Sequence, residues 1–216
     1  LYVDGTAYVD AINFNGTAIS ATAAELNLLD GASSLATSVD GLSDALVENN
    51  SIWVGNDPAS TTNTASYSVA LGTTALDAIT TGDDNVGIGY DALTANTSGS
   101  YNTAVGMSAL RYSTTASHNT GVGYNSLTDN TSGTANSGLG SRSLFLNTQG
   151  SNNTAVGKDA LKVNTTGSRN IAVGTGALDA PDTENDNLAI GYDALGGAIA
   201  GGEYNVAIGN YTLDAN

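Results

Sequence analysis

A 17-residue period constrains the fold of this chain more than any other feature of its sequence. Residues 102–106 read NTAVG, and the same five residues return at 153–157. The closing glycine of each copy recurs every 17 residues, except for a last interval of 18. These glycines are Gly55, Gly72, Gly89, Gly106, Gly123, Gly140, Gly157, Gly174, Gly191 and Gly209. Such self-similarity is typical of repeat architectures, in which successive copies stack on one another.

Four further positions of the unit are nearly constant. An aliphatic residue precedes each glycine, and Ala or Gly precedes that residue in every copy except the first, which has Trp53. The fourth residue after the glycine is Leu, at Leu76, Leu93, Leu110, Leu127, Leu144, Leu161, Leu178, Leu195 and Leu213. The fourth residue before it is Asn, at Asn85, Asn102, Asn119, Asn136, Asn153, Asn170, Asn187 and Asn205.

These features predict an all-β fold, a parallel β-solenoid or β-roll with one 17-residue coil per unit. The unit is too short for two helices, and its Gly, Asn, Thr and Ser are poor helix formers. Each coil would hold a strand of about five residues, a short Ala-Leu segment and a turn such as NTSGS at 96–100. The extra residue of the 18-residue unit falls within 196–203, where a loop tolerates an insertion.

The constant positions predict what lies inside the coil. We expect the aliphatic residue and the Leu to point inward and to form continuous columns along the stack. The Asn column is expected to pass side-chain hydrogen bonds from coil to coil, as stacked Asn ladders do. The alternative is that each Asn only fills a turn site.

Both sides of the predicted strand are restricted in sequence. Alternate strand residues face opposite sides, so an inward aliphatic row places the Ala/Gly row and the invariant Gly outside. Small outward side chains allow the backbone of a neighbouring chain to come close. The pattern therefore favours an oligomer with the small-residue row, including Ala104 and Ala155, at the contact. The alternative is a wall of small residues that faces water.

Residues 1–50 lack the period and are predicted to form a connector of short strands and short helices. Residues 51–216 form the predicted solenoid domain, and we expect the native protein to continue past Asn216. The turn dipeptides Asp4-Gly5 and Asn15-Gly16 indicate hairpin-like strands within the first 20 residues.

Two short helices are also expected near the start of the repeats. Thr22 and Glu25 have the spacing of a capping box, which predicts a helix over 23–30, and a second helix is predicted over 41–49. The first coil is degenerate, with Pro58 and Ala59 in the places of Ala and Leu. Its Trp53 is expected to close the end of an internal column, as a terminal cap does.

Composition excludes several classes of function. The net charge is −16 with only 5 Lys and Arg, which argues against binding nucleic acid or inserting into anionic membranes. The chain has no Cys, so disulfides and thiolate chemistry are excluded. No apolar run approaches the ~18 residues of a membrane span.

The sequence contains no convincing catalytic, cofactor-binding or metal-binding residues. His118 is the only histidine and is expected to be a solvated loop residue, so neither a catalytic triad nor a histidine metal site is predicted. Asp91, Asp159 and Asp193 share one repeat position, but other residue types interrupt the series, which favours a solvated face. The N-x-S/T triplets at Asn96, Asn130 and Asn164 lie in predicted turns. We therefore expect a protein that is not an enzyme and has no cofactor.

The repeats resemble those of phage tail fibres and related virion appendages, particularly of marine phages and cyanophages. The resemblance rests on GYDALTANTSGSYNTAVG (89–106), GKDALKVNTTGSRNIAVG (157–174), ISATAAELNLLDG (19–31) and LSDALVENNSIWVGN (42–56). The N-x-A-V/I-G strand is also similar to the head repeats of trimeric autotransporter adhesins, which have shorter units in a β-roll. Both resemblances imply a homotrimeric fibre, and neither implies catalysis.

The resulting expectation is a shaft segment of a tail fibre or virion appendage that supports host-cell attachment. Its partners would be copies of itself, other fibre or virion proteins, and a host receptor or glycan reached through a tip outside the segment. Its location would be the virion, outside the cell. The alternative is a bacterial trimeric surface adhesin whose solenoid binds a host surface or glycan. Ice binding is disfavoured because residues after the glycines, such as Tyr90, Met107 and Lys158, are too varied.

Overall fold

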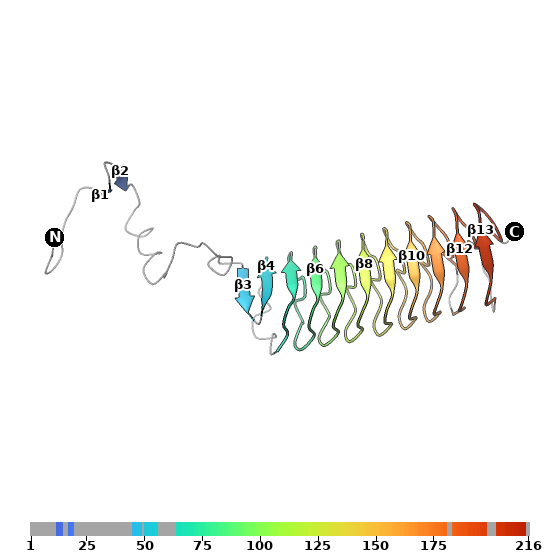
Figure 1. The fold of residues 1–216 in the computed structure, drawn as a ribbon, viewed down its shortest axis with the longest axis horizontal. Coiled ribbons are helices and arrows are strands. Elements are labelled where there is room, and N and C mark those ends of the chain that lie inside the picture. Colours follow the sequence, from blue (N-terminus) through green and yellow to red (C-terminus); the bar gives the residue numbers. More distant parts are fainter. Residues whose placement is uncertain are drawn as a thin grey trace.

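The computed structural model describes residues 12–14, 17–19, 45–48, 50–55, 64–180, 183–197 and 202–214, and every regular element among them is a β-strand (Figure 1). The strands are β1 (Ile12–Phe14), β2 (Thr17–Ile19), β3 (Ala45–Glu48), β4 (Ser51–Val54), β5 (Val69–Leu71), β6 (Val86–Ile88), β7 (Thr103–Val105), β8 (Thr120–Val122), β9 (Ser137–Leu139), β10 (Thr154–Val156), β11 (Ile171–Val173), β12 (Leu188–Ile190) and β13 (Val206–Ile208).

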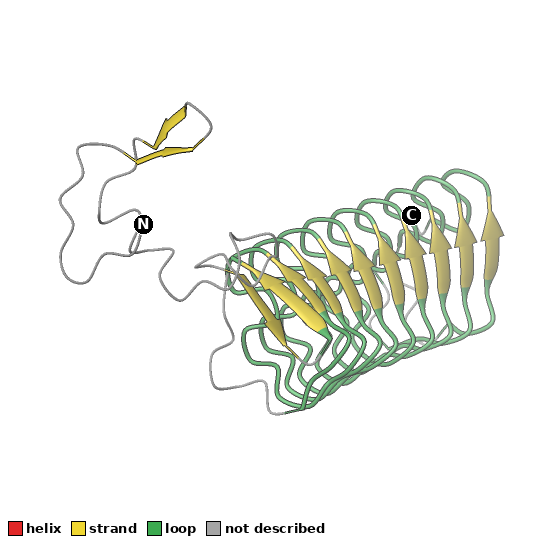
Figure 2. Ribbon diagram, turned by 60° about the vertical axis from the view of Figure 1, so that its left-hand side comes forward, coloured by secondary structure: helices red, strands yellow, loops and turns green. Residues whose placement is uncertain are grey.

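Strands β4 to β13 form one parallel sheet in which each strand pairs with the next strand along the chain. Equivalent repeat residues are direct partners, as in Thr103↔Thr120 and Val105↔Val122 between β7 and β8. The chain leaves each strand, runs around a coil of turns and returns beside the strand it left (Figure 2). The predicted all-β parallel solenoid is therefore confirmed. The longer last unit keeps the pairing, since Leu188 lies opposite Val206.

The Leu column forms the interior of the solenoid, as predicted. Leu76, Leu93, Leu110, Leu127, Leu144, Leu161, Leu178 and Leu195 are fully buried or within 1% of it. Leu213 is the exception at 59% exposed, because no described coil covers it. No single coil could bury its Leu alone, so stacking supplies the core.

Each interior Leu has an unusual backbone conformation. Leu127 has a φ of +53°, and the other leucines of the column have similar values. Left-handed backbone costs a non-glycine L-residue about 1–2 kcal/mol. The conformation lets the chain turn sharply while the Leu127 N–H donates to the Ser143 carbonyl oxygen at 2.9 Å in the next coil. Sequence reasoning missed this feature, because Leu carries no signal for positive φ.

The Asn residues before the strands form the predicted ladder. In a typical step the side-chain Nδ2 of Asn102 donates to Asn85 Oδ1 at 3.1 Å, and its backbone N–H donates to the same oxygen at 3.0 Å. Asn102 Nδ2 also donates to the Ala116 carbonyl oxygen at 2.8 Å. The ladder satisfies backbone groups that would otherwise be buried without partners, which is costly.

The invariant glycines are required by the next coil of the same chain. Gly140 has a φ of +138°, and a Cβ built on it would lie 2.5 Å from the Gly157 carbonyl oxygen. A side chain is therefore excluded both by backbone conformation and by space. The next coil of the same chain thus accounts for these glycines, without the neighbouring chain that the sequence pattern favoured.

The N-terminal end of the sheet differs from its middle. Strand β3 pairs antiparallel with β4, so it covers the edge that β4 would otherwise leave unpaired. The helix expected over 41–49 is wrong in its described part, which is β3. Trp53 is fully buried opposite Ala70, which confirms its predicted place at the end of an internal column.

The connector is described in part. Strands β1 and β2 pair antiparallel on either side of the Asn15-Gly16 dipeptide, which confirms the hairpin predicted there. The expected helix over 23–30 and the Asp4-Gly5, Pro58 and Ala59 positions lie outside the described residues.

Candidate functional site, the outer face of the parallel sheet

The aliphatic residue before each glycine points outward, opposite to the prediction. Leu71, Val122, Leu139, Val156, Ile190 and Ile208 are between 36% and 65% exposed. Val54, Ile88, Val105 and Val173 complete this row and are half-buried. The Ala/Gly row faces inward instead, with Ala104 and Ala155 fully buried. The prediction had the two sides of the strand reversed.

The space taken by the Leu column explains the reversal. A Cβ built on Gly87 would lie 3.2 Å from Leu76 Cγ, and one built on Gly121 would lie 3.4 Å from Leu110 Cγ. The interior beside each strand therefore has room for a methyl group or less. An inward Val or Ile would overlap the Leu, so the larger side chain must face outward.

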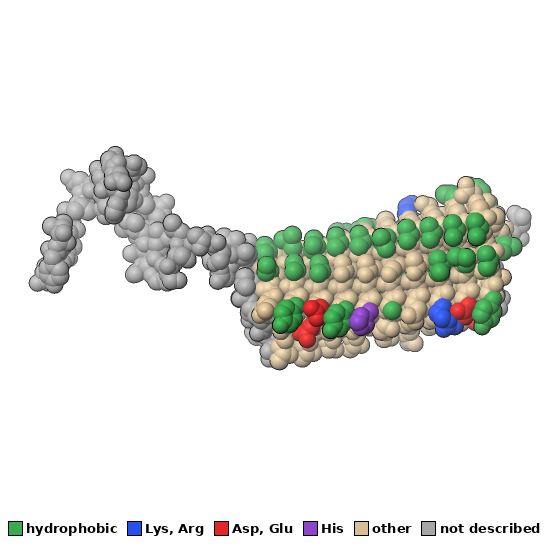
Figure 3. All heavy atoms as spheres, viewed as in Figure 1, with side chains coloured by type: hydrophobic (Ala, Val, Ile, Leu, Met, Phe, Trp, Pro, Cys, Tyr) green, Lys and Arg blue, Asp and Glu red, His purple; other side chains and the backbone are tan. Residues whose placement is uncertain are grey.

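A second outward row lies two residues before the aliphatic row. It is aliphatic in the first three strands, hydroxyl-bearing in the next four and aliphatic in the last three. In chain order the residues are Ile52, Val69, Val86, Thr103, Thr120, Ser137, Thr154, Ile171, Leu188 and Val206. Figure 3 shows one continuous hydrophobic row along the rod and, beside it, a row that is hydrophobic only towards its two ends.

We call these two rows together the outer sheet face. None of its twenty residues is charged, in a chain whose net charge is −16. Its exposed aliphatic side chains form a continuous patch along the described solenoid. Such a patch is larger than the scattered single apolar residues that are normal on a protein surface. Exposed apolar patches of this kind mark interaction surfaces.

Neither row contains a carboxylate, and several of the described carboxylates elsewhere are paired. Asp91 is only 5% exposed, its Oδ2 lies 3.0 Å from Arg111 Nη2, and it accepts a hydrogen bond from Thr74. Asp159 Oδ2 lies 2.8 Å from Arg142 Nη2. The prediction of a solvated acidic face is therefore wrong for Asp91, which is buried and neutralised by an arginine.

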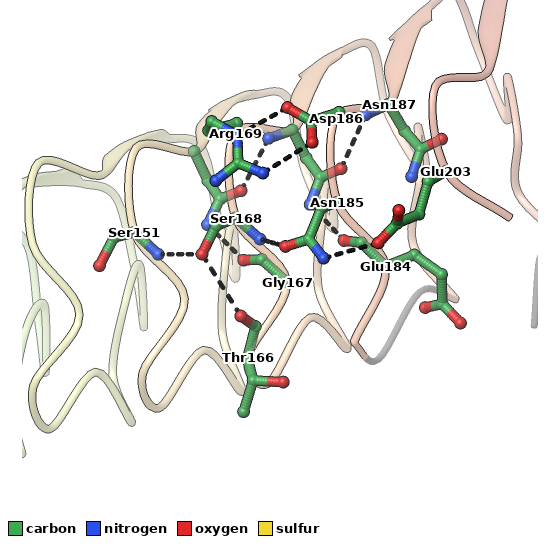
Figure 4. A network of polar contacts seen from close by, with 12 residues as sticks. Ser151, Thr166, Gly167, Ser168, Arg169, Glu184, Asn185, Asp186, Asn187 and Glu203 are labelled. Atoms are coloured by element: carbon green, nitrogen blue, oxygen red, sulfur yellow. Dashed lines mark hydrogen bonds and ion pairs between the residues drawn. The ribbon is translucent and has the colours of Figure 1, made fainter. Parts of the chain in front are cut away.

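The turns that precede the strands carry a second polar ladder. Ser168 Oγ accepts from the Ser151 N–H at 3.0 Å, and Asn185 Oδ1 accepts from the Ser168 N–H at 2.8 Å (Figure 4). Beside them Arg169 donates two hydrogen bonds of 2.7 Å to Asp186. These contacts join successive coils of one chain, so the polar groups that make them stabilise the stacking of the coils.

The remaining candidate residues do not converge on a site. His118 is exposed, as expected, and its ring stacks on Tyr101 with centroids 4.8 Å apart. Asn96, Asn130 and Asn164 are fully buried in their turns, where the Nδ2 of each donates to a nearby carbonyl oxygen.

Other classes of site are not found among the described residues. No group of three or more His, Cys, Asp or Glu residues there has the arrangement to hold a metal ion. The described part of the chain also contains no helix of the length and apolarity needed to span a bilayer.

The outer sheet face is thus the one extended feature that sequence reasoning placed wrongly, although the signal was present. A row of large aliphatic residues opposite a row of Ala and Gly identifies two faces without saying which is internal.

Comparisons with family models, curated proteins and solved structures find no match to the chain.

Proposed function

We propose that this chain is a rigid shaft segment of a fibre, such as a phage tail fibre or another virion appendage. In this proposal it acts outside the cell, has no catalytic activity, and holds a host-binding tip away from the particle. The observation that carries the proposal is the uncharged outer sheet face, which is formed by a stack of ten parallel strands. A rod with one continuous apolar side is suited to bundling lengthwise with other rods.

The shaft is proposed to be a homotrimer that buries the outer sheet face. Burial of apolar surface contributes roughly 25 cal/mol per Å², and a row that spans the described solenoid offers such surface in every coil. Each chain carries −16, so a contact without carboxylates limits repulsion between copies. The aliphatic row thereby takes the interface role that the sequence pattern suggested for the Ala/Gly row.

Light scattering coupled to size-exclusion chromatography tests the trimer. The expected mass is three times the 21.5 kDa of one chain. Val122→Asp together with Val156→Asp adds two charges to the outer sheet face and should give a monomer. Tyr112→Asp together with Tyr67→Asp adds the same charges at exposed positions outside the two rows and should leave the trimer intact. A wild-type mass of one folded chain would refute the proposal.

The alternative function, a surface adhesin, is favoured by the aromatic residues. Eight tyrosines among the described residues are all at least 45% exposed, at Tyr67, Tyr90, Tyr101, Tyr112, Tyr124, Tyr192, Tyr204 and Tyr211. Exposed aromatic rings give an amphipathic surface that suits recognition. Direct binding of the isolated solenoid to host-cell glycans would favour the adhesin. A solenoid that binds none, while forming a trimer, would favour the shaft.

A further inference from the structure

The second row of the outer sheet face breaks the repeat in one place. Its residues in β7 to β10 are Thr103, Thr120, Ser137 and Thr154, which we call the hydroxyl band, while three aliphatic residues flank the band on each side. The row before the glycines is aliphatic throughout. Because the coils are otherwise so alike, the band is the main feature of this face that distinguishes one position along the rod axis from another.

The hydroxyls of the band are not used within the chain. The four side chains are half-buried, and none of their hydroxyls hydrogen-bonds to another described residue. Threonines elsewhere in the coil do bond to the next coil. Thr97 Oγ1 donates to the Thr114 carbonyl oxygen at 3.0 Å, and Thr131 and Thr148 donate in the same way at 3.0 Å. The band therefore presents free donors and acceptors outward.

We infer that the hydroxyl band sets the axial alignment of neighbouring copies of this chain in the fibre. The inference rests on the proposed trimer through the outer sheet face. A uniform aliphatic face would bury nearly the same area if one copy slipped by a whole coil. The band removes this degeneracy, as a buried polar residue does in a coiled coil.

The alignment follows from hydrogen-bonding chemistry. In the aligned assembly, hydroxyls face hydroxyls, and each can donate to and accept from its counterpart. A slip of one coil moves the hydroxyl at each end of the band against an aliphatic side chain. A buried hydroxyl without a partner is unfavourable, so slipped assemblies are disfavoured.

The partner that fits this face is another copy of the same chain, running in the same direction. A matching partner needs aliphatic groups at the coil spacing and a polar interruption of four coils at the same height. Identical copies satisfy both conditions. Three copies related by one rotation axis also all run the same way.

Disulfide trapping tests the alignment, because the chain has no Cys of its own. One tagged chain carries Val122→Cys on β8, and a second, differently tagged chain carries Leu139→Cys on β9. The two chains are co-expressed, oxidised and separated on a non-reducing gel. Because a disulfide needs Cβ atoms about 3.8 Å apart, aligned copies should form disulfides only between like chains. A disulfide between unlike chains reports a slip of one coil.

A shifted band makes the test decisive. Val86→Thr combined with Thr154→Val moves the band one coil towards the N-terminus and keeps the composition of the row. When the Val122→Cys chain carries this change and its Leu139→Cys partner does not, matching the two bands places β8 opposite β9. Disulfides between unlike chains should then become the main product. The same pair of chains with unshifted bands is the matched control.

A second variant removes the band by changing Thr103, Thr120, Ser137 and Thr154 to Val. It should give both kinds of disulfide. Its control changes Thr97, Thr114, Thr131 and Thr148 to Val, which removes hydrogen bonds inside the chain but leaves the outer sheet face unchanged. This control should give disulfides between like chains only.

The outcomes separate the inference from the proposed function. A monomer by light scattering overturns both. A trimer in which the shifted band leaves the disulfide pattern unchanged overturns the inference and leaves the trimer standing. A trimer without any disulfide, or one in which wild-type bands already give disulfides between unlike chains, also overturns the inference.

Discussion

The two sides of each strand show opposite relations between side-chain size and burial. In β10, Ala155 is fully buried while its neighbour Val156 is 37% exposed. In an ordinary half-buried strand the larger apolar residue faces the core. Here a separate column of leucines already fills the coil, so the inward strand position accepts only Ala or Gly. The comparison teaches that available volume, rather than hydrophobicity alone, decides which face is internal.

The largest expected effect comes from charging the interior. Leu127 is fully buried and Tyr124 is 48% exposed, three residues earlier in the same coil. Leu127→Asp places a carboxylate in the leucine column without a partner and should cost at least about 4 kcal/mol of unfolding free energy. Tyr124→Asp should change it by less than about 0.5 kcal/mol. Urea unfolding measures both, and equal losses would contradict the assignment of inside and outside.

A smaller effect is expected from enlarging adjacent residues on the two faces. Ala155→Phe inserts a ring where the Leu column leaves no space, and should lower the unfolding free energy by about 3 kcal/mol. Val156→Phe points outward and should leave fold stability within about 0.5 kcal/mol, while altering assembly.

Thermal unfolding followed by circular dichroism compares the two Phe variants, and light scattering reports their mass. If Ala155 lay at a contact between chains, as the sequence pattern favoured, Phe there would overpack that contact and impair assembly. A stable, folded Ala155→Phe variant that is merely monomeric would support that placement.

The smallest expected change in unfolding free energy concerns the carboxylate of Asp179, which lies on neither strand face. Burial, and secondarily the nearby Asp193 carboxylate, raises the pKa of Asp179 above its usual 3.8. The folded chain therefore disfavours the ionised form, and stability falls as the pH rises through the raised pKa. Asp179→Asn should stabilise the fold at pH 7 by less than about 0.5 kcal/mol, and the gain should vanish below about pH 4.

Asp186 is the control for Asp179, because its pKa is shifted in the opposite direction. Its hydrogen bonds from Arg169 lower the pKa of Asp186, so its contribution is present at neutral pH and is lost as the pH falls through the lowered pKa. Asp186→Asn should therefore destabilise slightly at pH 7 and not in acid. Melting temperatures from pH 3 to 7 distinguish the two substitutions, and parallel curves would contradict the assigned pKa directions.

Much of the fold could be predicted because a period reports stacking directly. Residues 17 apart had to be neighbours, and their identities indicated a Leu column, an Asn ladder and parallel strands. Trp53 could be placed because it interrupts a row of small residues. The Asn15-Gly16 hairpin followed from turn chemistry that acts within a few residues.

Other features depended on contacts that the period does not encode. Ala45–Glu48 lies in a segment with local helix signals, yet it pairs with β4 because that strand offers an open edge. Asp91 lies in a position that other coils fill with different residues, yet it is buried and paired with Arg111 of the next coil. In each case a tertiary partner overrode a local preference.

The sequence alone determined the unit, its length, its parallel stacking and the two-sided character of its strand, because these follow from recurrence and from alternation along an extended backbone. Only the tertiary structure decided which side is internal. Alternation is symmetric between two faces, and the symmetry is broken by volume. The leucines reach the interior through a left-handed turn that sequence does not signal, and once they fill the coil, only the small-residue row fits beside them. The aliphatic row is thereby left on the outside, where the candidate interface lies.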